Sequence, residues 1–260
     1  MDPPPAPPPP PPALGVVVPA RNEVDAVPAL LAAVGPLLRS GSVARVVLVD
    51  NGSTDGTADA AAAGGLDVVA EPRPGYGAAC LAGIARLRAA EPNLGAVGFL
   101  DADLADDPAL LPGLAAPVLA GEADLVLGQR AARAQAGALG GHQRFGNALA
   151  TGLMALATGT RHRDLGPMRV VSPAALDRLG MADRTWGWTL EMQHKAITRG
   201  LRVREVDVPY RRRTTGKSKI SGSLVGSARA AVVITRTVGS LWWTERRRAP
   251  APPARSARRP

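Results

Sequence analysis

The sequence has a single cysteine, few aromatic residues and no long uncharged apolar run. Cys80 is the only cysteine among 260 residues, so no disulfide can close within the chain. No uncharged run reaches the roughly 20 residues that span a bilayer. No stretch has the basic start, apolar centre and small-residue cleavage site of a signal peptide. We therefore expect a cytoplasmic chain that does not cross a membrane.

Positive charge is concentrated toward the C-terminus. Residues 202–260 hold 15 Arg and Lys against 3 Asp and Glu, and residues 1–201 hold 16 against 19, which gives the net charge of +9. A segment this basic is typical of chains that bind nucleic acid, anionic lipid or substrate phosphate. Nucleic acid is disfavoured, because the segment lacks interleaved stacking aromatics and a recognisable binding module.

Both ends of the chain have compositions that disfavour a fold. The leader "MDPPPAPPPPPPA" (1–13) lacks the N–H donors that helices and sheets need. We expect it to be a disordered spacer, with an SH3-type ligand as the alternative. Residues 245–260 are expected to form a disordered basic tail. Between these ends we expect one domain over 14–221 and an amphipathic segment over 222–244.

Short apolar runs alternate with longer stretches rich in alanine and leucine. Strands are predicted at residues 14–19, 43–50, 66–70, 95–101 and 123–128, and again at 203–210. Runs that are apolar on both faces and separated by helices are typical of a mostly parallel α/β sheet with helices on both sides. Ligands of such sheets bind beyond the carboxyl ends of the strands.

Polar clusters follow three of these strands. They are "PARNE" after the first, "DNGSTDGT" after the second and "DADLADD" after the fourth. We expect them to converge on one crevice. The segment "STDGT" also predicts a helix start, with Ser53 or Thr54 as cap and Asp55 in the first turn.

The acidic cluster "DADLADDP" puts two carboxylates, Asp101 and Asp103, at the end of a buried strand. Two anions in one crevice repel each other unless a cation lies between them. Oxygen ligands suit Mg²⁺ or Mn²⁺, which is usually shared with substrate phosphates. The alternative is an acidic loop leading into a helix cap, and for Asp106 and Asp107 we adopt that interpretation.

Taken together, the motifs "VVVPARNE", "VVLVDNGSTDGT", "RPGYGAAC" and "FLDADLADDP" resemble those of family 2 glycosyltransferases with the GT-A fold. The later motifs "LVLGQR", "DLGPMRVV", "WGWTLEMQHKA" and "RRRTTGKSK" are similar to the polyprenyl-phosphate sugar synthases, the dolichyl-phosphate mannose synthase-like branch. The resemblance covers about 210 residues. It implies a Rossmann-like sheet and a metal-dependent, inverting sugar transfer.

The resemblance also implies where the donor lies. The nucleotide-diphosphate sugar would contact residues of the first two strand tips, the glycine turn and the acidic motif: Pro19, Ala20, Arg21, Glu23, Asp50, Gly75, Gly77, Asp101, Ala102 and Asp103. Asp101 and Asp103 would hold the metal. The glycines would let the backbone approach the nucleotide closely, or would form an ordinary strand-to-helix turn. Ala105 stands where the branch often has a glutamine ligand.

A polyprenyl phosphate acceptor is already an anionic nucleophile, so it needs arginines to hold it instead of a general base. The resemblance assigns this acceptor to Arg130, Arg144, Arg213, Ser218 and Lys219. For the basic loop and for Arg144, a solvated surface remains the alternative.

Roles are also expected for three further groups of residues. The resemblance places Glu191 with Asp103 and Arg130 among the catalytic residues, where it is expected to orient the site or to pair with an arginine. Asp164 and Arg169 would position the acceptor or form a structural pair at the far edge of the sheet. The histidines His142, His162 and His194 lack ligand spacing and are expected on polar surfaces.

In the segment 222–243, Arg229 and Arg236 are seven residues apart and would share one helix face. With Trp242 and Trp243 at its end, this helix is expected either in an anionic lipid interface or packed on the sheet.

The sequence thus favours transfer of a sugar to polyprenyl phosphate at the inner face of the plasma membrane. Transfer to a small hydroxyl acceptor such as a phosphorylated acid is the first alternative, and a non-catalytic membrane-associated protein is the second. A nucleotidyltransferase is disfavoured, because no G-x-G-x-R loop follows the first strand.

Overall fold

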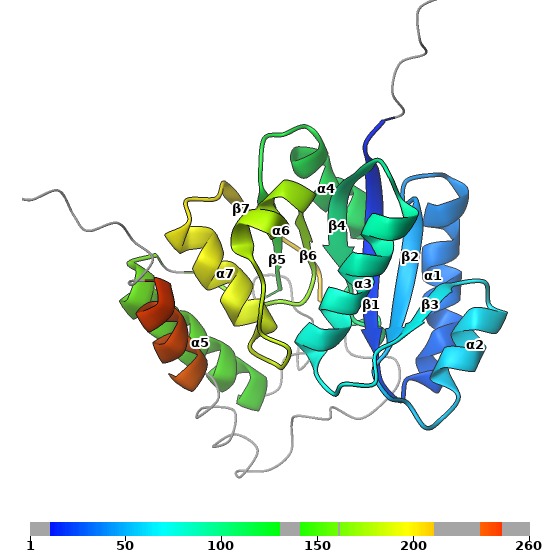
Figure 1. Ribbon diagram of the computed structural model, residues 1–260, viewed down its shortest axis with the longest axis horizontal. Coiled ribbons are helices and arrows are strands. Elements are labelled where there is room, and N and C mark those ends of the chain that lie inside the picture. Colours follow the sequence, from blue (N-terminus) through cyan, green and yellow to red (C-terminus); the bar gives the residue numbers. More distant parts are fainter. Residues whose placement is uncertain (1–10, 131–140, 161, 211–234, 246–260) are drawn as a thin grey trace, which may run out of the picture.

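The computed structural model describes residues 11–130, 141–160, 162–210 and 235–245. Seven strands form one sheet at the centre of the molecule, and helices cover both of its faces (Figure 1). The predicted α/β class is confirmed.

The strands run in the order β3-β2-β1-β4-β6-β5-β7. Their bounds are β1 Ala13–Ala20, β2 Arg45–Asp50, β3 Asp67–Ala70, β4 Leu94–Phe99, β5 Leu125–Gln129, β6 Arg169–Val171 and β7 Val203–Asp207. Every pairing is parallel except those of β6, which is antiparallel to both β4 and β5. The carboxyl ends of the six parallel strands therefore meet at one edge, which we call the carboxyl edge.

All six predicted strands are present, and β6 is the one that the sequence did not predict. The parallel strands were predictable because their residues are buried on both faces, as in Val16, Val17 and Val18 of β1. In contrast, β6 has three residues and begins with an arginine. A run of that length carries no periodicity.

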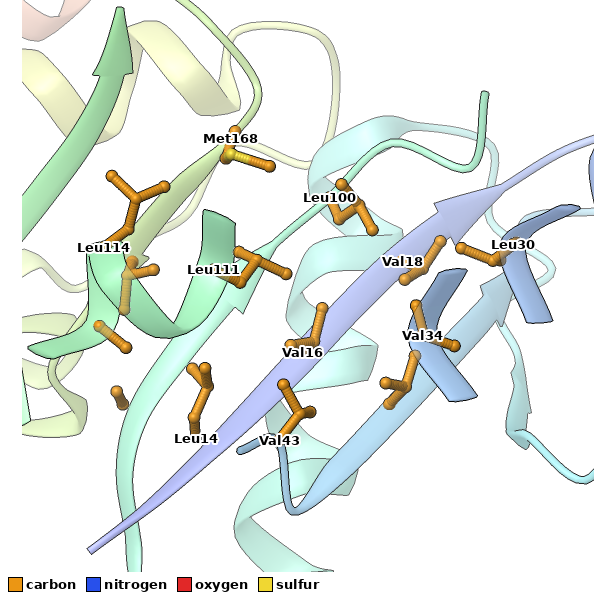
Figure 2. Close-up of a cluster of buried hydrophobic side chains, with 14 of the residues drawn as sticks. Leu14, Val16, Val18, Leu30, Val34, Val43, Leu100, Leu111, Leu114 and Met168 are labelled. Carbon is orange, nitrogen blue, oxygen red and sulfur yellow. The ribbon is translucent and has the colours of Figure 1, made fainter. Parts of the chain in front are cut away.

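The two faces of the sheet have separate helical layers. One layer contains α1 (Val27–Arg39), α2 (Thr57–Ala63) and α4 (Leu111–Leu119), and the other contains α3 (Tyr76–Ala90), α6 (Pro173–Leu179) and α7 (Trp188–Thr198). Short 3-10 turns, η1 (Val24–Ala26) and η2 (Pro108–Leu110), precede α1 and α4. Figure 2 shows the first layer, in which Leu30 and Val34 of α1 and Leu111 and Leu114 of α4 pack on alternate residues of β1.

A third apolar cluster lies outside these layers. Helix α5 (Gly141–Thr158) and the helix at 235–245 lie side by side next to α7 (Figure 1). Met154, Leu190 and Val238 are buried between them, and Arg199 binds Glu245 at 2.6 Å.

The described part of the predicted amphipathic segment is therefore packed on the protein. It contacts helices α5 and α7. The alternative in which this helix packs on the protein had placed it against the sheet. Residues 222–234 of that segment lie outside the described part of the chain. Among the described helices, none combines the length and the apolar character needed to cross a membrane.

Candidate active site at the carboxyl edge

The tips of β1 and β2 are joined by side-chain hydrogen bonds. The backbone N–H of Asn22 donates to Ser53 Oγ at 2.9 Å, and the backbone N–H of Thr54 donates to the side-chain oxygen Oδ1 of Asn22 at 2.8 Å. The Glu23 N–H donates to Thr57 Oγ1 at 2.9 Å. The predicted donor residues Pro19, Ala20, Arg21, Glu23 and Asp50 thus lie on two adjoining, interlinked tips. Their contact with a nucleotide stays a prediction.

The helix after β2 begins later than predicted. Helix α2 starts at Thr57 with Gly56 as its N-cap residue, so neither Ser53 nor Thr54 is the cap. Asp55 therefore precedes the helix and is not in its first turn, but it stabilises the turn before α2 by accepting hydrogen bonds from the Val24 and Thr57 N–H groups. Burial raises the pKa of Asp55, but these bonds and that from the Thr57 hydroxyl lower it overall.

Asn51 is a structural residue of the edge that sequence reasoning missed. Its buried side-chain amide donates to the carbonyls of Glu71 and Arg73 at 2.9 and 2.8 Å, and it accepts from the Gly75 N–H at 2.8 Å. One side chain therefore ties the tip of β2 to the loop between β3 and α3. Its place in the "DNGST" motif was the available signal.

Gly75 and Gly77 are required by a neighbouring loop. A Cβ on Gly75 would lie 2.0 Å from the Arg184 carbonyl oxygen, and one on Gly77 would lie 2.0 Å from that of Asp183. Gly75 also has φ +143°, a conformation that favours glycine. The space that we assigned to an approaching nucleotide is thus filled by the loop 181–187 between α6 and α7.

The acidic pair lies where the sequence predicted, directly after β4. Asp103 is buried, and its Oδ1 accepts from the Ala105 N–H at 3.0 Å. Leu104 between them has φ +54°, a left-handed conformation that is uncommon for a branched side chain. Tyr76 contacts Asp101 from α3. Burial, and then the charge of Asp101 and a hydrogen bond with it, raise the pKa of Tyr76.

Asp106 differs from our expectation. Asp107 caps η2, since its carboxylate accepts from the Ala109 N–H at 3.0 Å. Asp106 is only 2% exposed, and within the described chain neither carboxylate oxygen has a hydrogen-bond partner. Burial is the main cause that raises the pKa of Asp106, to about 7. The charge of Arg130 lowers this pKa, and the charges of Asp101 and Asp103 raise it further.

The carboxylate oxygens that follow β4 suit a hard divalent cation. Asp101 and Asp103 supply carboxylate oxygens, which Mg²⁺ and Mn²⁺ prefer. Among the described residues, no three His, Cys, Asp or Glu side chains form a group that could hold a metal by themselves. A cation at Asp101 and Asp103 would therefore need further oxygen ligands, such as those of a diphosphate or of water.

Arg130 forms a bidentate charge pair with Asp164 at the carboxyl edge. Its Nε and Nη2 bind the two carboxylate oxygens of Asp164 at 2.8 and 2.9 Å, and its backbone N–H binds the same carboxylate at 3.0 Å. The guanidinium also lies 5.0 Å from the centre of the Tyr210 ring. Burial lowers the pKa of Arg130, but Asp164 outweighs it and the net shift is upward.

The expected pair of Asp164 and Arg169 is therefore wrong. Arg169 is on β6 in the interior of the sheet, not at its far edge. It donates to the carbonyls of Gly166, Pro167 and Thr189, and burial lowers its pKa.

Among the described residues, Glu191 is paired with a lysine and not with an arginine. Lys195 Nζ lies 2.6 Å from its Oε1, and the N–H groups of Ala182 and Asp183 also donate to this carboxylate. Helix α7, which carries both side chains, begins at Trp188. By holding the loop 181–187, Glu191 is placed to orient the edge. A direct catalytic role stays a prediction.

Two histidines are buried, contrary to the expectation of polar surfaces. His162 is bonded to Glu205 at 2.6 Å, and His194 lies in α7 with both ring nitrogens unpartnered within the described chain. The side chains of Arg144 and His142, and all of Arg213, Ser218 and Lys219, lie outside the described residues. Their predicted roles therefore stay predictions.

Residues 15–180 match the family model "Glycosyl transferase family 2". The chain belongs to this family. The glycosyltransferase is 45% identical over 219 residues to an uncharacterized glycosyltransferase of Mycobacterium tuberculosis, covering 83% of this chain and 93% of that one. It is 28% identical over 240 residues to the undecaprenyl-phosphate mannosyltransferase of Micrococcus luteus, covering 85% and 91%.

Among solved structures, this glycosyltransferase is similar to the glucosyl-3-phosphoglycerate synthase of Mycobacterium tuberculosis in complex with Mn²⁺, UDP and glucosyl-3-phosphoglycerate. The TM-score is 0.71 at 24% identity, over 89% of this chain and 80% of the other. This likeness confirms the predicted GT-A fold. Membership of the family supports an enzyme and leaves the non-catalytic alternative without support.

Proposed function

We propose that this glycosyltransferase moves a sugar from a nucleotide diphosphate to a polyprenyl phosphate, with inversion, while bound peripherally to the inner face of the membrane. The main support for this class of acceptor is Arg130. Its largely buried guanidinium lies at the end of β5, and Asp164 and Tyr210 hold it in one orientation. Its charge persists at any physiological pH, and a guanidinium held in one orientation suits phosphate oxygens.

The donor would lie across the tips of β1, β2 and β4. A divalent cation bound to Asp101 and Asp103 would neutralise the diphosphate and stabilise the charge of the leaving nucleotide. Asp103 is held for this role by the Ala105 N–H and by the turn at Leu104. The interlinked tips of β1 and β2 would give the nucleoside a preformed surface.

In the reaction, an acceptor phosphate oxygen forms a bond to the anomeric carbon as the bond to the diphosphate oxygen breaks. The electron pair of that bond remains on the nucleoside diphosphate. No proton has to leave an ionised phosphate, so no general base is required. The similarity to the undecaprenyl-phosphate mannosyltransferase extends over nearly the whole length of that protein and supports this acceptor class.

A second candidate is transfer to a hydroxyl of a small phosphorylated acid. The observation that favours it is Asp106, a buried carboxylate without a hydrogen-bond partner among the described residues, which could accept the proton of an acceptor hydroxyl. The likeness to glucosyl-3-phosphoglycerate synthase supports the fold of such an enzyme.

The test incubates the full chain with Mn²⁺, radiolabelled UDP-glucose or GDP-mannose, and either undecaprenyl phosphate in detergent or 3-phosphoglycerate. Label in the organic phase that appears only with the lipid supports the first candidate. Label in a water-soluble product that appears only with the acid overturns it in favour of the second. The Asp106→Asn variant adds an independent readout, since it should retain lipid transfer and lose transfer to a hydroxyl.

A further inference from the structure

Trp186 is one of the most exposed large apolar side chains of the described structure, with 62% of its surface accessible. It belongs to the loop 181–187, which joins α6 to α7. A single exposed apolar residue needs no explanation on its own. Trp186 does need an explanation, because its loop is held by hydrogen bonds and because its ring is stacked on Tyr76, which contacts Asp101.

The rigidity of the loop comes from bonds at both of its sides. The carbonyls of Arg184 and Thr185 accept from the Ala78 and Gly77 N–H groups at 2.9 and 3.0 Å. On the opposite side, the buried carboxylate of Glu191 binds the N–H groups of Ala182 and Asp183. The first turn of α3 is thus satisfied by the loop, and the indole of Trp186 is held in place before any ligand arrives.

Two aromatic contacts place this loop beside the acidic pair. The Trp186 ring is stacked on Tyr76 with 6.1 Å between centroids and 18° between planes, and Tyr76 in turn contacts Asp101. At the end of the loop, Trp188 packs at 6.2 Å on Phe99, two residues before Asp101. The ring of Tyr76 and its hydrogen bond with Asp101 thus connect Trp186 to the acidic pair.

The ligand that fits this place is the sugar of the donor. With diphosphate at Asp101 and Asp103, the attached hexose would extend toward the side chains that surround the acidic pair, and the stacked rings of Tyr76 and Trp186 are among them. The C–H face of a hexose is apolar and packs on an indole face, whereas the nucleoside is expected at the tips of β1 and β2. Neither candidate acceptor contains a hexose, so the hexosyl group of the donor is the one hexose in the complex, and the ribose belongs to the nucleoside expected at the tips of β1 and β2.

We propose that Trp186 is a specificity-determining residue on which the hexosyl ring of the donor stacks, with Tyr76 and the loop 181–187 holding the indole in position. This inference rests on the donor part of the proposed function and holds for either acceptor. It makes Trp186 responsible for the difference in affinity between a nucleotide sugar and the bare nucleotide.

The test is calorimetric binding with Mn²⁺ of UDP, UDP-glucose, GDP and GDP-mannose. For the preferred pair, Trp186→Ala should lower affinity for the nucleotide sugar by roughly five- to tenfold and leave the bare nucleotide within about twofold. Trp186→Phe should restore most of the loss. The matched control is Trp243→Ala, which removes a tryptophan that is 56% exposed near the C-terminal end of the helix 235–245 and should change neither affinity.

The outcomes separate this inference from the function on which it rests. An equal loss for nucleotide and nucleotide sugar in Trp186→Ala, or no loss for either, overturns the hexose contact and leaves the proposed function in place. A wild-type chain that binds none of the four ligands overturns both. Unchanged melting temperatures of the variants show that the loop has kept its fold.

Discussion

The two halves of the carboxyl edge differ in how their polar groups are satisfied. At the tips of β1 and β2, Asn22, Asn51 and Asp55 all have hydrogen-bond partners from neighbouring segments. At the tips of β4 and β5, the carboxylate of Asp106 has no such partner in the described chain. Each half also has a non-glycine residue with a left-handed backbone, Asn22 and Leu104, but asparagine tolerates this conformation better than leucine does. In the β1–β2 half the polar side chains are paired, whereas in the β4–β5 half the unpartnered carboxylate of Asp106 lowers the stability of the folded state.

This difference shows where chemistry is expected. A satisfied network is explained by folding alone, because it removes the penalty of burying polar groups. A buried carboxylate without partners lowers stability, and the proton-accepting role that Asp106 has in the second candidate function would account for its presence. We infer that the β1–β2 half shapes the donor site and that the β4–β5 half carries the reactive charges.

The largest effect is expected when the charge pair of the β4–β5 half is broken. Arg130→Met leaves Asp164 buried without its partner, so the free energy of unfolding should fall by about 3–5 kcal/mol in urea titrations. The control is Arg204→Met, because the pair of Arg204 with Glu122 is solvent-exposed. There the loss should stay below about 1 kcal/mol. Equal losses in the two variants would contradict the importance that we give to burial.

The second prediction concerns Asp106. Because its folded pKa of about 7 exceeds the ordinary value of 3.8, the folded state keeps a proton that the unfolded chain releases between these pH values. Wild-type stability should therefore fall as pH rises from about 4 to 7, and the fall should be absent in Asp106→Asn. Without metal, the two proteins should diverge by up to about 4 kcal/mol across this window. Parallel pH curves would refute the shift.

The third prediction concerns the acidic pair. Asp103→Asn keeps the shape of the turn but removes the charge, so transfer should fall by about 10²–10³-fold, as when one stabilising group of a transition state is lost. Asp107→Asn is the matched control, because this acid caps η2 and should leave the rate within about twofold. Radiolabel transfer measures both. Unaltered activity in Asp103→Asn would remove the basis of the metal assignment.

The smallest effects are expected from one glycine-to-alanine substitution near each half of the carboxyl edge, Gly56 before α2 and Gly113 in α4. Gly56 before α2 has φ +86°, so Gly56→Ala should cost about 1 kcal/mol through backbone strain. Gly113 in the exposed face of α4 has no atom near the added Cβ, and Gly113→Ala should gain about 0.5–1 kcal/mol. Thermal unfolding measures the two shifts, which should have opposite signs.

Much of the fold could be predicted from particular residues. The valines of β1 and β2 indicated strands buried on both faces, and the acids after β4 were placed correctly at the carboxyl edge. The strand β6 escaped because three residues show no period. Asp106 and Asp107 could not be told apart, since adjacent acids before a proline carry the same local signal, although one is a surface cap and the other is buried.

The sequence by itself determined the alternation of strands and helices and the place of the acidic motif, because these follow from local periodicity and from the direction of parallel strands. Only the tertiary structure decided that Arg130 pairs with Asp164, 34 residues away, that Arg169 lies inside the sheet, and that Gly75 and Gly77 admit the loop 181–187. The reason is that partners distant in sequence are selected by how the strands and loops pack, and composition or spacing along the chain does not encode that packing in a readable form.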